Sequence, residues 1–406
     1  MSPMKHILTG FKVLDFSHVL AGPSATRIMA EMGADVIKVE TPTLGDLSRL
    51  LPVFKNGRSA YYLQQNRGKR SICVNLKEEE GKAIIRELLK QVDVVMENFA
   101  PGVIGRLGFG WEQVHALNPR AVMCSISAFG QQGPLANLPG YDYIAQAYSG
   151  VTSMIGEPDG APSLPMLGIG DVMTGVHAAC AIGYALLHRE RGGLGQYLDI
   201  SLLDSYFHCH EINVQVYSAS GGQTVPTRCG HHHFAVTPLG LFKAREHYIC
   251  IIALDQQWPG VCRAIGRPEL AADERYDKNL KRVERSAEVN AMIQAWMDSM
   301  PSDDAILKAL EAERIPVAPV RTIAEAVNEP HLRDRGTVRA ITDPKFGSLE
   351  VPGMPLRFSG FPNNIPLDAA YLGEHNAEIL SSVLGYSAER IDTLAQNGVL
   401  YANPET

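Results

Sequence analysis

The first third of the chain alternates short runs of β-branched and apolar residues with stretches of helical periodicity. Strands are predicted at 11–16, 36–40, 71–76, 93–99 and 121–127, and helices at 23–32, 78–91 and 111–117. Helices between successive strands are typical of βαβ units, in which the strands lie parallel and the helices cover the faces of the sheet. The pattern therefore predicts an α/β fold with a parallel sheet.

A chain of 406 residues exceeds the usual size of one hydrophobic core, so two domains are expected. The apolar stretch at 172–187 is interrupted by His177 and is shorter than the roughly 20 residues of a membrane span, so we interpret it as a buried helix. The composition changes near 223–230, and a strand at 248–253 precedes helices at 288–297 and 303–313. We expect a large domain over 1–205, a linker over 206–226, a small domain over 227–316, and a return to the large domain over 317–406.

The overall charge limits the partners that the chain could bind. The formal net charge is −7, which provides no broad basic surface for nucleic acid or for an acidic membrane. The seven cysteines include no CxxC pair, and residues 1–10 contain no apolar run of the kind found in secretory signals. We therefore expect a cytoplasmic protein, without a disulfide framework, whose anionic ligands would need a local group of cations.

Asp171 is the leading candidate for chemistry, because it follows Gly168 and Gly170 at the start of an apolar helical stretch. The simpler interpretation is a helix N-cap, which stabilises a helix by about 1 kcal/mol and is favoured by position alone. The alternative is a nucleophile. The two glycines remove side-chain bulk, so that a ligand and backbone N–H donors can approach the carboxylate. A carboxylate at the positive end of a helix could attack a thioester carbonyl while those donors stabilise the oxyanion.

Two further segments could bind a ligand. Residues 15–24 combine a strand end, a glycine turn and a helix start, and His18 there could contact a ligand or a buried carbonyl group. Residues 66–71 include Arg67, Lys69 and Arg70, which would usually form a solvated loop but in an acidic protein could hold a phosphate. Arg106 adds a cation near the turn that follows 98–102.

Three adjacent histidines, His231 to His233, follow Gly230 and suggest a metal site at first sight. Adjacent side chains point in different directions, and no HxxxH or CxxC sequence follows to complete a site. We expect no metal site here and interpret the segment as a mobile, polar loop.

Five separated motifs resemble those of the class III CoA-transferases, which include the formyl-CoA:oxalate and carnitine CoA-transferases and are related to the α-methylacyl-CoA racemases. The motifs lie at 15–23, 34–40, 66–71, 95–99 and 168–171, and the similarity continues through 373–376. The resemblance implies a Rossmann-like large domain built from both ends of the chain, an inserted smaller α+β domain, and an interlocked homodimer. It also implies an enzyme with acyl-CoA and a carboxylic acid as substrates, with no permanently bound cofactor. In such an enzyme CoA moves through aspartyl anhydride and aspartyl-CoA thioester intermediates, and a dicarboxylic donor such as succinyl-CoA is expected.

The resemblance also assigns individual residues. Asp171 matches the catalytic aspartate, with Gly168 and Gly170 beside it as oxyanion support. The positions that match substrate or CoA contacts are His18, Val19, Leu20, Ala21, Asn98, Phe99, Arg106 and Tyr141, and Arg67, Lys69 and Arg70 are candidates for phosphate contacts.

Two departures from the family pattern bear on the reaction. Leu20 stands where the formyl-CoA enzyme has glutamine, which disfavours that enzyme's small polar substrates. Tyr141 stands where the racemases have a histidine that acts as one of two acid/base groups. A tyrosine, with an ordinary pKa of about 10, is poorly suited to that role at neutral pH. CoA transfer is therefore favoured over racemisation, and noncatalytic binding of acyl-CoA is the remaining alternative.

Overall fold

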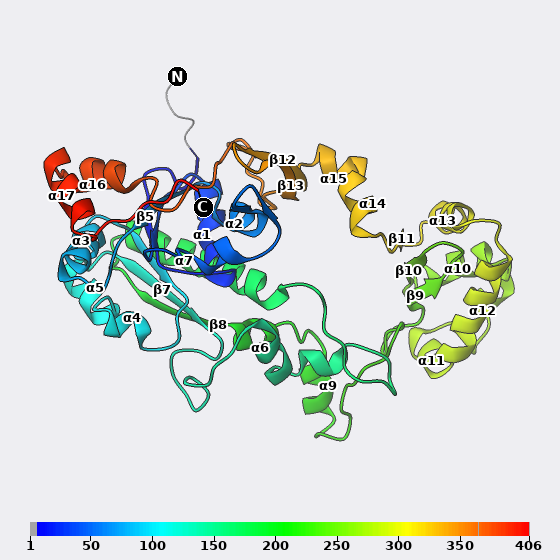
Figure 1. The fold of residues 1–406 in the computed structure, drawn as a ribbon. Coiled ribbons are helices and arrows are strands. Elements are labelled where there is room, and N and C mark those ends of the chain that lie inside the picture. The colour runs from blue at the N-terminus through cyan, green and yellow to red at the C-terminus, as the bar shows by residue number, and fades with distance from the viewer. Residues whose placement is uncertain (1–5, 364, 406) are drawn as a thin grey trace. The chain divides into compact units, whose positions relative to one another are not determined.

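A computed structural model describes residues 6–363 and 365–405 (Figure 1). The chain divides into two compact units. Unit 1 contains the described residues up to Val151, then Met166–Glu211, and the chain from Pro330 onward. Unit 2 contains Thr152–Pro165 and Ile212–Glu329.

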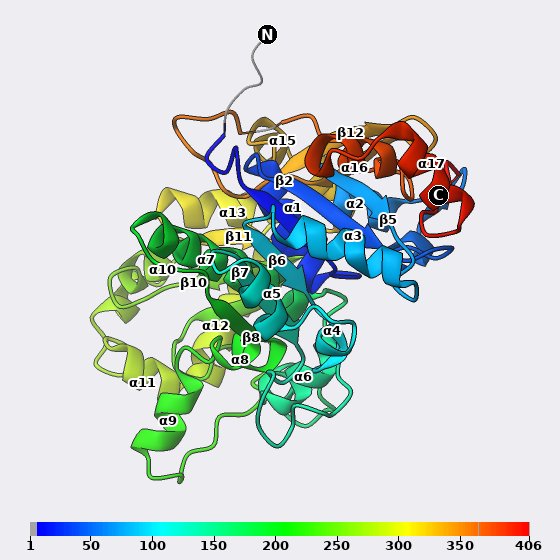
Figure 2. The same ribbon diagram turned by 90° about the vertical axis from the view of Figure 1, so that its left-hand side faces the viewer.

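Unit 1 is built on a six-stranded sheet in which every strand is parallel to its neighbours (Figure 2). The spatial order is β5-β2-β1-β6-β7-β8, which is the strand order of a Rossmann fold. The order reverses between β1 and β6, and open sheets of this kind bind ligands at such a switch point. The predicted parallel α/β sheet is confirmed. Its strands are β1 (Lys12–Asp15), β2 (Asp35–Glu40), β5 (Lys69–Cys73), β6 (Val94–Glu97), β7 (Val122–Ser127) and β8 (Tyr197–Ser201).

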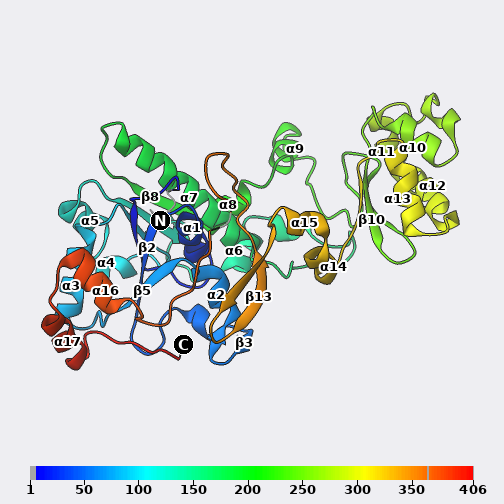
Figure 3. The ribbon, with the colours of Figure 1, turned by 90° about the horizontal axis from the view of Figure 1, so that it is seen from above.

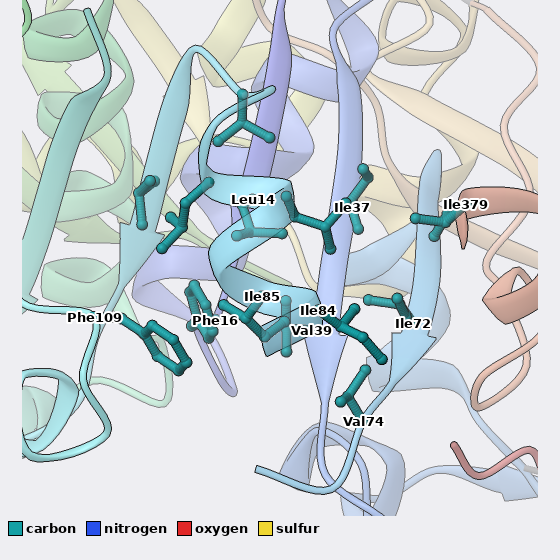
Figure 4. Packing of buried hydrophobic residues seen from close by; sticks show 14 of the residues in the cluster. Leu14, Phe16, Ile37, Val39, Ile72, Val74, Ile84, Ile85, Phe109 and Ile379 are labelled. Carbon is teal, nitrogen blue, oxygen red and sulfur yellow. The ribbon is translucent and has the colours of Figure 1, made fainter. Parts of the chain in front are cut away.

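Successive side chains of the central strands enter two different cores, as expected of a sheet covered on both faces. Leu14 and Ile37 pack with Ile84 and Ile85 of helix α3 (Glu79–Leu89), as Figure 4 shows. Val13 and its neighbours pack on the opposite face against α1 (Ala21–Glu31) and α7 (Ile169–Glu190). The first core also receives residues from α5 (Trp111–Leu117) and from the C-terminal helices α16 (Asn376–Leu384) and α17 (Ala388–Gln396).

Both ends of the chain therefore contribute to unit 1, since α16 lies beside α3 although nearly 300 residues separate them (Figure 1). Unit 1 also contains two small antiparallel sheets, one formed by β3 and β4 and one by β12 and β13. The remaining elements of this unit are η1 (Leu47–Leu50), β3 (Phe54–Lys55), β4 (Arg58–Ser59), α2 (Ala60–Asn66), α4 (Val103–Arg106), α6 (Asp142–Tyr148), α8 (Leu202–Phe207), α15 (Pro330–Asp334), β12 (Val338–Asp343) and β13 (Gly347–Pro352).

Helix α7 is buried along one face only. Ala178 lies in the core, and Gly175 allows α7 to cross α1 closely, because a Cβ at Gly175 would lie 2.7 Å from the carbonyl oxygen of Ala21. Val176 and Tyr184 are exposed on the remaining surface. The prediction of a buried helix is therefore correct for one face of α7. This helix is also long and apolar enough to cross a membrane, as core helices of soluble proteins often are.

Unit 2 has a three-stranded antiparallel sheet in the order β11-β10-β9, packed against helices around Trp258 and Ile293 (Figure 3). The sheet consists of β9 (Leu239–Lys243), β10 (Tyr248–Ile252) and β11 (Val317–Pro319). The helices are η2 (Val151–Met154), which spans the boundary with unit 1, α9 (Asn213–Ala219), α10 (Trp258–Ala264), η3 (Pro268–Ala271), α11 (Asn279–Glu284), α12 (Ser286–Ser299), α13 (Asp303–Ala312) and α14 (Ile323–Asn328).

The unit boundaries differ from the predicted domain ranges in three places. The predicted return at 317 falls inside unit 2, because β11 pairs with β10 and the chain re-enters unit 1 only at Pro330. Most of the predicted linker over 206–226 belongs to unit 2, where it forms α9. The segment 152–165, predicted as part of the large domain, also clusters with unit 2.

Candidate active site

The loops that leave β1 and β6 meet at the switch point of the sheet and are joined by reciprocal hydrogen bonds. The backbone N–H of His18 donates to Asn98 Oδ1 at 2.7 Å, and Asn98 Nδ2 donates to the carbonyl oxygen of His18 at 2.9 Å. The N–H of Val19 donates to Asp46 Oδ1 at 3.1 Å. Val19 has a φ of 67°, which a β-branched residue rarely adopts, so these bonds hold the loop in a strained conformation.

Buried ion pairs support this loop. Lys38 Nζ lies 2.7 Å from Asp46 Oδ2, and Lys69 Nζ lies 3.1 Å from Asp15 Oδ2. Burial alone would raise the pKa of Asp15, but Lys69 and Lys38 lower it to about 2. Breaking such a pair leaves an uncompensated buried charge, which typically costs about 3–5 kcal/mol. The network therefore holds the exit of β1 in place beneath the site.

A cavity of about 430 Å³ lies at the switch point. It adjoins a second cavity of about 580 Å³, since both are lined by His18, Thr41 and Phe99. The second cavity extends to Leu107 and Lys77. The first is lined in addition by six residues that the sequence had singled out, namely Val19, Leu20, Ala21, Asn98, Tyr141 and Asp171.

Asp171 lies in the first turn of α7, three residues after the N-cap, which is Gly168. The interpretation of Asp171 as the N-cap is therefore wrong. Burial, and secondarily the charge of Asp142, raise the pKa of the Asp171 carboxyl to about 7. The ordinary pKa of an aspartate is about 4, so this environment disfavours the charged form strongly. A half-buried carboxyl with such a pKa in a cavity is typical of a functional site.

Two residues that the sequence analysis did not assign flank the nucleophile candidate. Asp142, which is the first residue of α6, accepts a hydrogen bond from the Tyr206 hydroxyl, and Gln146 Nε2 donates to that hydroxyl at 3.2 Å. The backbone N–H of Asp171 points to Asp142 Oδ2 at 3.5 Å. Asp142 directly follows Tyr141 in the motif compared with the racemases, so its position in the sequence offered a signal. Tyr206 had none.

A third unassigned residue is Tyr61 of α2. Burial, and next the negative charge of Asp171, raise the pKa of its phenol to about 12. The phenol therefore stays protonated at neutral pH and can donate a hydrogen bond close to the carboxylates. Its separation from Asp171 by about 110 positions in the sequence left no local pattern that could have identified it.

Gly170 is required for close packing, whereas Gly168 leaves room for the end of the flexible Leu20 side chain. A Cβ at Gly170 would lie 2.1 Å from Tyr206 Cε2, and one at Gly168 would lie 2.6 Å from Leu20 Cδ2. The backbone of Gly170 already forms a hydrogen bond with the Tyr206 side chain. The expectation that the Gly170 N–H serves the oxyanion is therefore not supported by this structure. An alternative set of donors lies at the N-terminus of α1, because Ala21 lines the cavity and no side chain caps that helix.

The cations of the segment 66–71 do not lie at this cavity. Arg67 is fully buried and its Nη2 lies 2.6 Å from Glu31 Oε1. The prediction that Arg67 and Lys69 bind ligand phosphates is wrong for this structure, because both charged groups are buried and paired with carboxylates. Arg70 lies on the edge strand β5 and pairs with Asp35 at 2.5 Å. Arg106 is exposed at the end of α4.

The histidine segment belongs to unit 2. His231 Nε2 lies 3.4 Å from Glu157 Oε1, and the N–H of Gly230 donates to the carbonyl oxygen of Gly156 at 3.2 Å. Within 6–363 and 365–405, no group of three or more His, Cys, Asp or Glu could hold a metal ion. The interpretation of this segment as a mobile, polar loop stays a prediction.

Comparison with known proteins agrees with this geometry. Residues 8–376 match the CoA-transferase family III. The succinyl-CoA:glutarate CoA-transferase of Mus musculus is 36% identical over 398 residues, covering 97% of this chain and 90% of that protein. The formyl-CoA:oxalate CoA-transferase of Bradyrhizobium diazoefficiens is 34% identical over 420 residues, covering 98% of each chain. The crystal structure of a CAIB/BAIF family protein from Brucella suis matches with a TM-score of 0.81 and 32% identity, over 93% of this chain and 100% of that one. The chain therefore belongs to CoA-transferase family III and is an enzyme that transfers CoA to a carboxylic acid.

Proposed function

We propose that this enzyme transfers CoA from an acyl-CoA to a free carboxylic acid through covalent intermediates on Asp171. The observation that carries the proposal is the position of the Asp171 carboxyl in a cavity at the switch point of the sheet. With a pKa of about 7, this carboxyl is ionised in a large fraction of the molecules at neutral pH, and burial leaves it poorly solvated. Such a carboxylate is well suited to nucleophilic attack on a thioester.

The cycle comprises four acyl transfers. The Asp171 carboxylate attacks the donor carbonyl, the C–S bond breaks, and a mixed anhydride and CoA thiolate form. The thiolate attacks the aspartyl carbonyl, which releases the donor acid and leaves an aspartyl-CoA thioester. The acceptor carboxylate attacks this thioester and forms a second mixed anhydride with release of thiolate. The thiolate then attacks the acceptor carbonyl, which yields the new acyl-CoA and restores Asp171.

The surrounding residues have separate tasks in this scheme. Tyr206 holds Asp142 by a hydrogen bond, and the charge of Asp142 adds to the effect of burial, which is the main cause of the raised pKa of Asp171. The N-terminus of α1, where Ala21 lines the cavity and no side chain caps the helix, would offer backbone N–H groups and the positive end of a helix dipole to the developing oxyanion. Each such donor typically contributes about 3 kcal/mol to the stabilisation of the transition state.

The adjoining cavity suits the remainder of CoA. A ligand that reacts at Asp171 could extend past His18 and Phe99, which line both cavities, toward Lys77. Arg106 lies one residue before Leu107, which also lines the second cavity. We therefore assign Lys77 and Arg106 as contacts for the phosphates of CoA, in place of Arg67 and Lys69.

We also propose that the enzyme acts as an interlocked homodimer, as the sequence resemblance implies, and that it is cytoplasmic, in keeping with cysteines that form no CxxC pair. Support for a second copy comes from the exposed apolar surface of α7, since Val172, Val176 and Tyr184 are 44%, 45% and 69% exposed. Contiguous apolar surface of this kind commonly marks a protein interface.

The direct test of the proposed function is the isosteric variant Asp171→Asn. We expect it to lose several powers of ten in turnover, while circular dichroism and acyl-CoA binding stay unchanged. Transfer that persists in the variant would reject Asp171 as the nucleophile. If the wild-type enzyme instead exchanges the α-proton of a 2-methylacyl-CoA with deuterated water and transfers no CoA, the racemase alternative is correct.

A further inference from the structure

Glu97 is the last residue of β6, at the edge of the sheet where the two cavities lie, and it is only 1% exposed. The backbone N–H of Phe99 donates to Glu97 Oε2 at 2.7 Å, and Ser125 is its neighbour in register on β7. Neither of these partners is a cation. By contrast, the buried carboxylate of Asp15 on the adjacent strand is paired with Lys69 at 3.1 Å.

A buried carboxyl without a cation is unfavourable for folding. Burial raises the pKa of Glu97 to about 7, and the contacts with Ser125 and with the N–H of Phe99 offset only part of the rise. An apolar side chain at this position would avoid the cost of burying the acid. Carboxyls with raised pKa values occur preferentially at functional sites. The position of Glu97 beside the cavities therefore points to a role beyond packing.

The turn after β6 carries two side chains to the candidate active site, and Glu97 binds the backbone of that turn. Asn98 exchanges two hydrogen bonds with the backbone of His18, at 2.7 and 2.9 Å. The ring of Phe99 lies 5.5 Å from that of His18, between centroids, and lines both cavities. Loss of the bond from the Phe99 N–H to Glu97 would free the backbone between these two side chains.

We propose that Glu97 is a positioning residue for the CoA ester, because its carboxylate holds the backbone N–H of Phe99 and thereby fixes the Phe99 ring in the wall shared by the two cavities. Glu97 itself is not among the described residues that line either cavity. Its effect should therefore fall on the affinity for the CoA ester and not on acyl transfer at Asp171. The inference rests on the proposed function only in placing the CoA ester in these two cavities.

Two variants separate the hydrogen bond of Glu97 from its bulk. Glu97→Gln keeps an oxygen that can accept from the Phe99 N–H, whereas Glu97→Leu occupies similar space without an acceptor. We expect Glu97→Leu to raise the KM for acyl-CoA by about tenfold with less than about threefold change in kcat, and Glu97→Gln to restore both values to within about threefold of the wild type. Isothermal titration calorimetry with free CoA measures the same change in affinity without turnover.

Asn118→Leu is the control for a merely structural loss. Asn118 Oδ1 likewise accepts the backbone N–H two residues later, that of Arg120 at 3.1 Å, but it precedes β7 and so lies at the opposite end of the parallel sheet. This variant should lower the melting temperature and leave KM and kcat unchanged. An equal rise of KM in Asn118→Leu and Glu97→Leu would show that general destabilisation causes the effect, and would overturn the inference.

A double-mutant cycle tests whether Glu97 acts through Phe99. Phe99→Ala alone should weaken CoA binding by about tenfold, and adding it to Glu97→Leu should weaken binding little further, because both changes remove the same contact. Independent effects of the two substitutions would overturn the inference, as would a folded Glu97→Leu variant that binds CoA like the wild type. Unchanged CoA binding in Phe99→Ala would count against both the inference and the placement of CoA in these cavities.

Discussion

Asp171 illustrates how the surroundings of one carboxyl can prepare it for covalent chemistry. The sequence identified this residue through its glycine neighbours and its motif, but it suggested the wrong local role, since Gly168 is the N-cap. Tyr61 and Tyr206 could not be assigned from the sequence, because only the folded chain brings α2 and α8 to the start of α7, whereas Asp142 was missed although it adjoins the motif residue Tyr141. The sequence also suggested a wrong role for Arg67 and Lys69. Both were predicted as candidates for phosphate contacts, but in the structure their charged groups are buried and paired with carboxylates.

The raised pKa of Asp171 predicts a pH dependence of the reaction. The nucleophile is the ionised form, so kcat/KM for the acyl-CoA donor should rise with pH and level off above an apparent pKa of about 7. Asp142→Asn removes a negative neighbour, so the apparent pKa should fall while the contribution of burial remains. Initial rates from about pH 5.5 to about pH 8.5 provide the measurement. An unchanged apparent pKa in the variant would show that Asp142 does not act on Asp171.

The same pKa shift predicts a cost in stability. The folded-state pKa of about 7 lies above the unfolded value of about 4, so the unfolded chain releases this proton first. The free energy of unfolding should therefore decrease as pH rises from about 4 to about 7, and the loss should be complete above that range. Asp171→Asn removes the ionisable group and should raise the melting temperature by about 2 °C near pH 8, with a smaller effect near pH 5. A variant that melts lower than the wild type at both pH values would contradict this account.

At the scale of elements, the central sheet was predictable and the connections were not. Short runs of mainly apolar residues, such as 121–127, alternate with helical stretches and identified the strands of the parallel sheet. A strand buried on both faces has few charged positions, so it is recognised as such a run. The pairing of β11 with β10 depends on contacts between residues about 70 positions apart, which the sequence pattern does not encode. The boundary between the two units was therefore misplaced at 317.

Helix α7 allows a test of whether its N-terminal glycine is required for packing. Gly170→Ala would force a Cβ into Tyr206 and Asp142, and we expect it to cost about 1–3 kcal/mol of stability and to reduce turnover strongly. Gly183 lies in the same helix with no heavy atom within 4 Å of a Cβ built there. Gly183→Ala should thus be neutral or stabilise the protein by up to about 1 kcal/mol, with unchanged activity. Chemical denaturation of both variants compares them directly, and equal effects would reject the packing argument.

At the scale of the whole molecule, the sequence resemblance implied a large domain made from both chain ends, and the course of α16 and α17 agrees with it. Composition and periodicity alone could not have placed the C-terminal helices beside α3, since nearly 300 residues separate α3 from α16. A change in composition near 223–230 predicted a separate small unit. Only the pairing of β11 with β10 shows that this unit continues past 317.

The proposed homodimer predicts that the exposed face of α7 is buried in solution. Replacing Val176 and Tyr184 together by glutamate should shift the protein from dimer to monomer or aggregate in size-exclusion chromatography with light scattering. Leu280→Glu is the control, because Leu280 is 76% exposed but lies on α11 of unit 2. A wild-type protein that is monomeric at micromolar concentration would reject the dimer.

The central claim is that Asp171 carries CoA during turnover, and peptide mapping of the trapped enzyme tests it most directly. Hydroxylamine added while donor and acceptor are turning over should convert Asp171 to its hydroxamate, since both the anhydride and the thioester are activated acyl groups. Borohydride should likewise reduce the thioester at this residue. We predict that the modification is confined to the peptide containing Asp171 and requires acyl-CoA. An unmodified Asp171 in an enzyme that is transferring CoA would contradict the account.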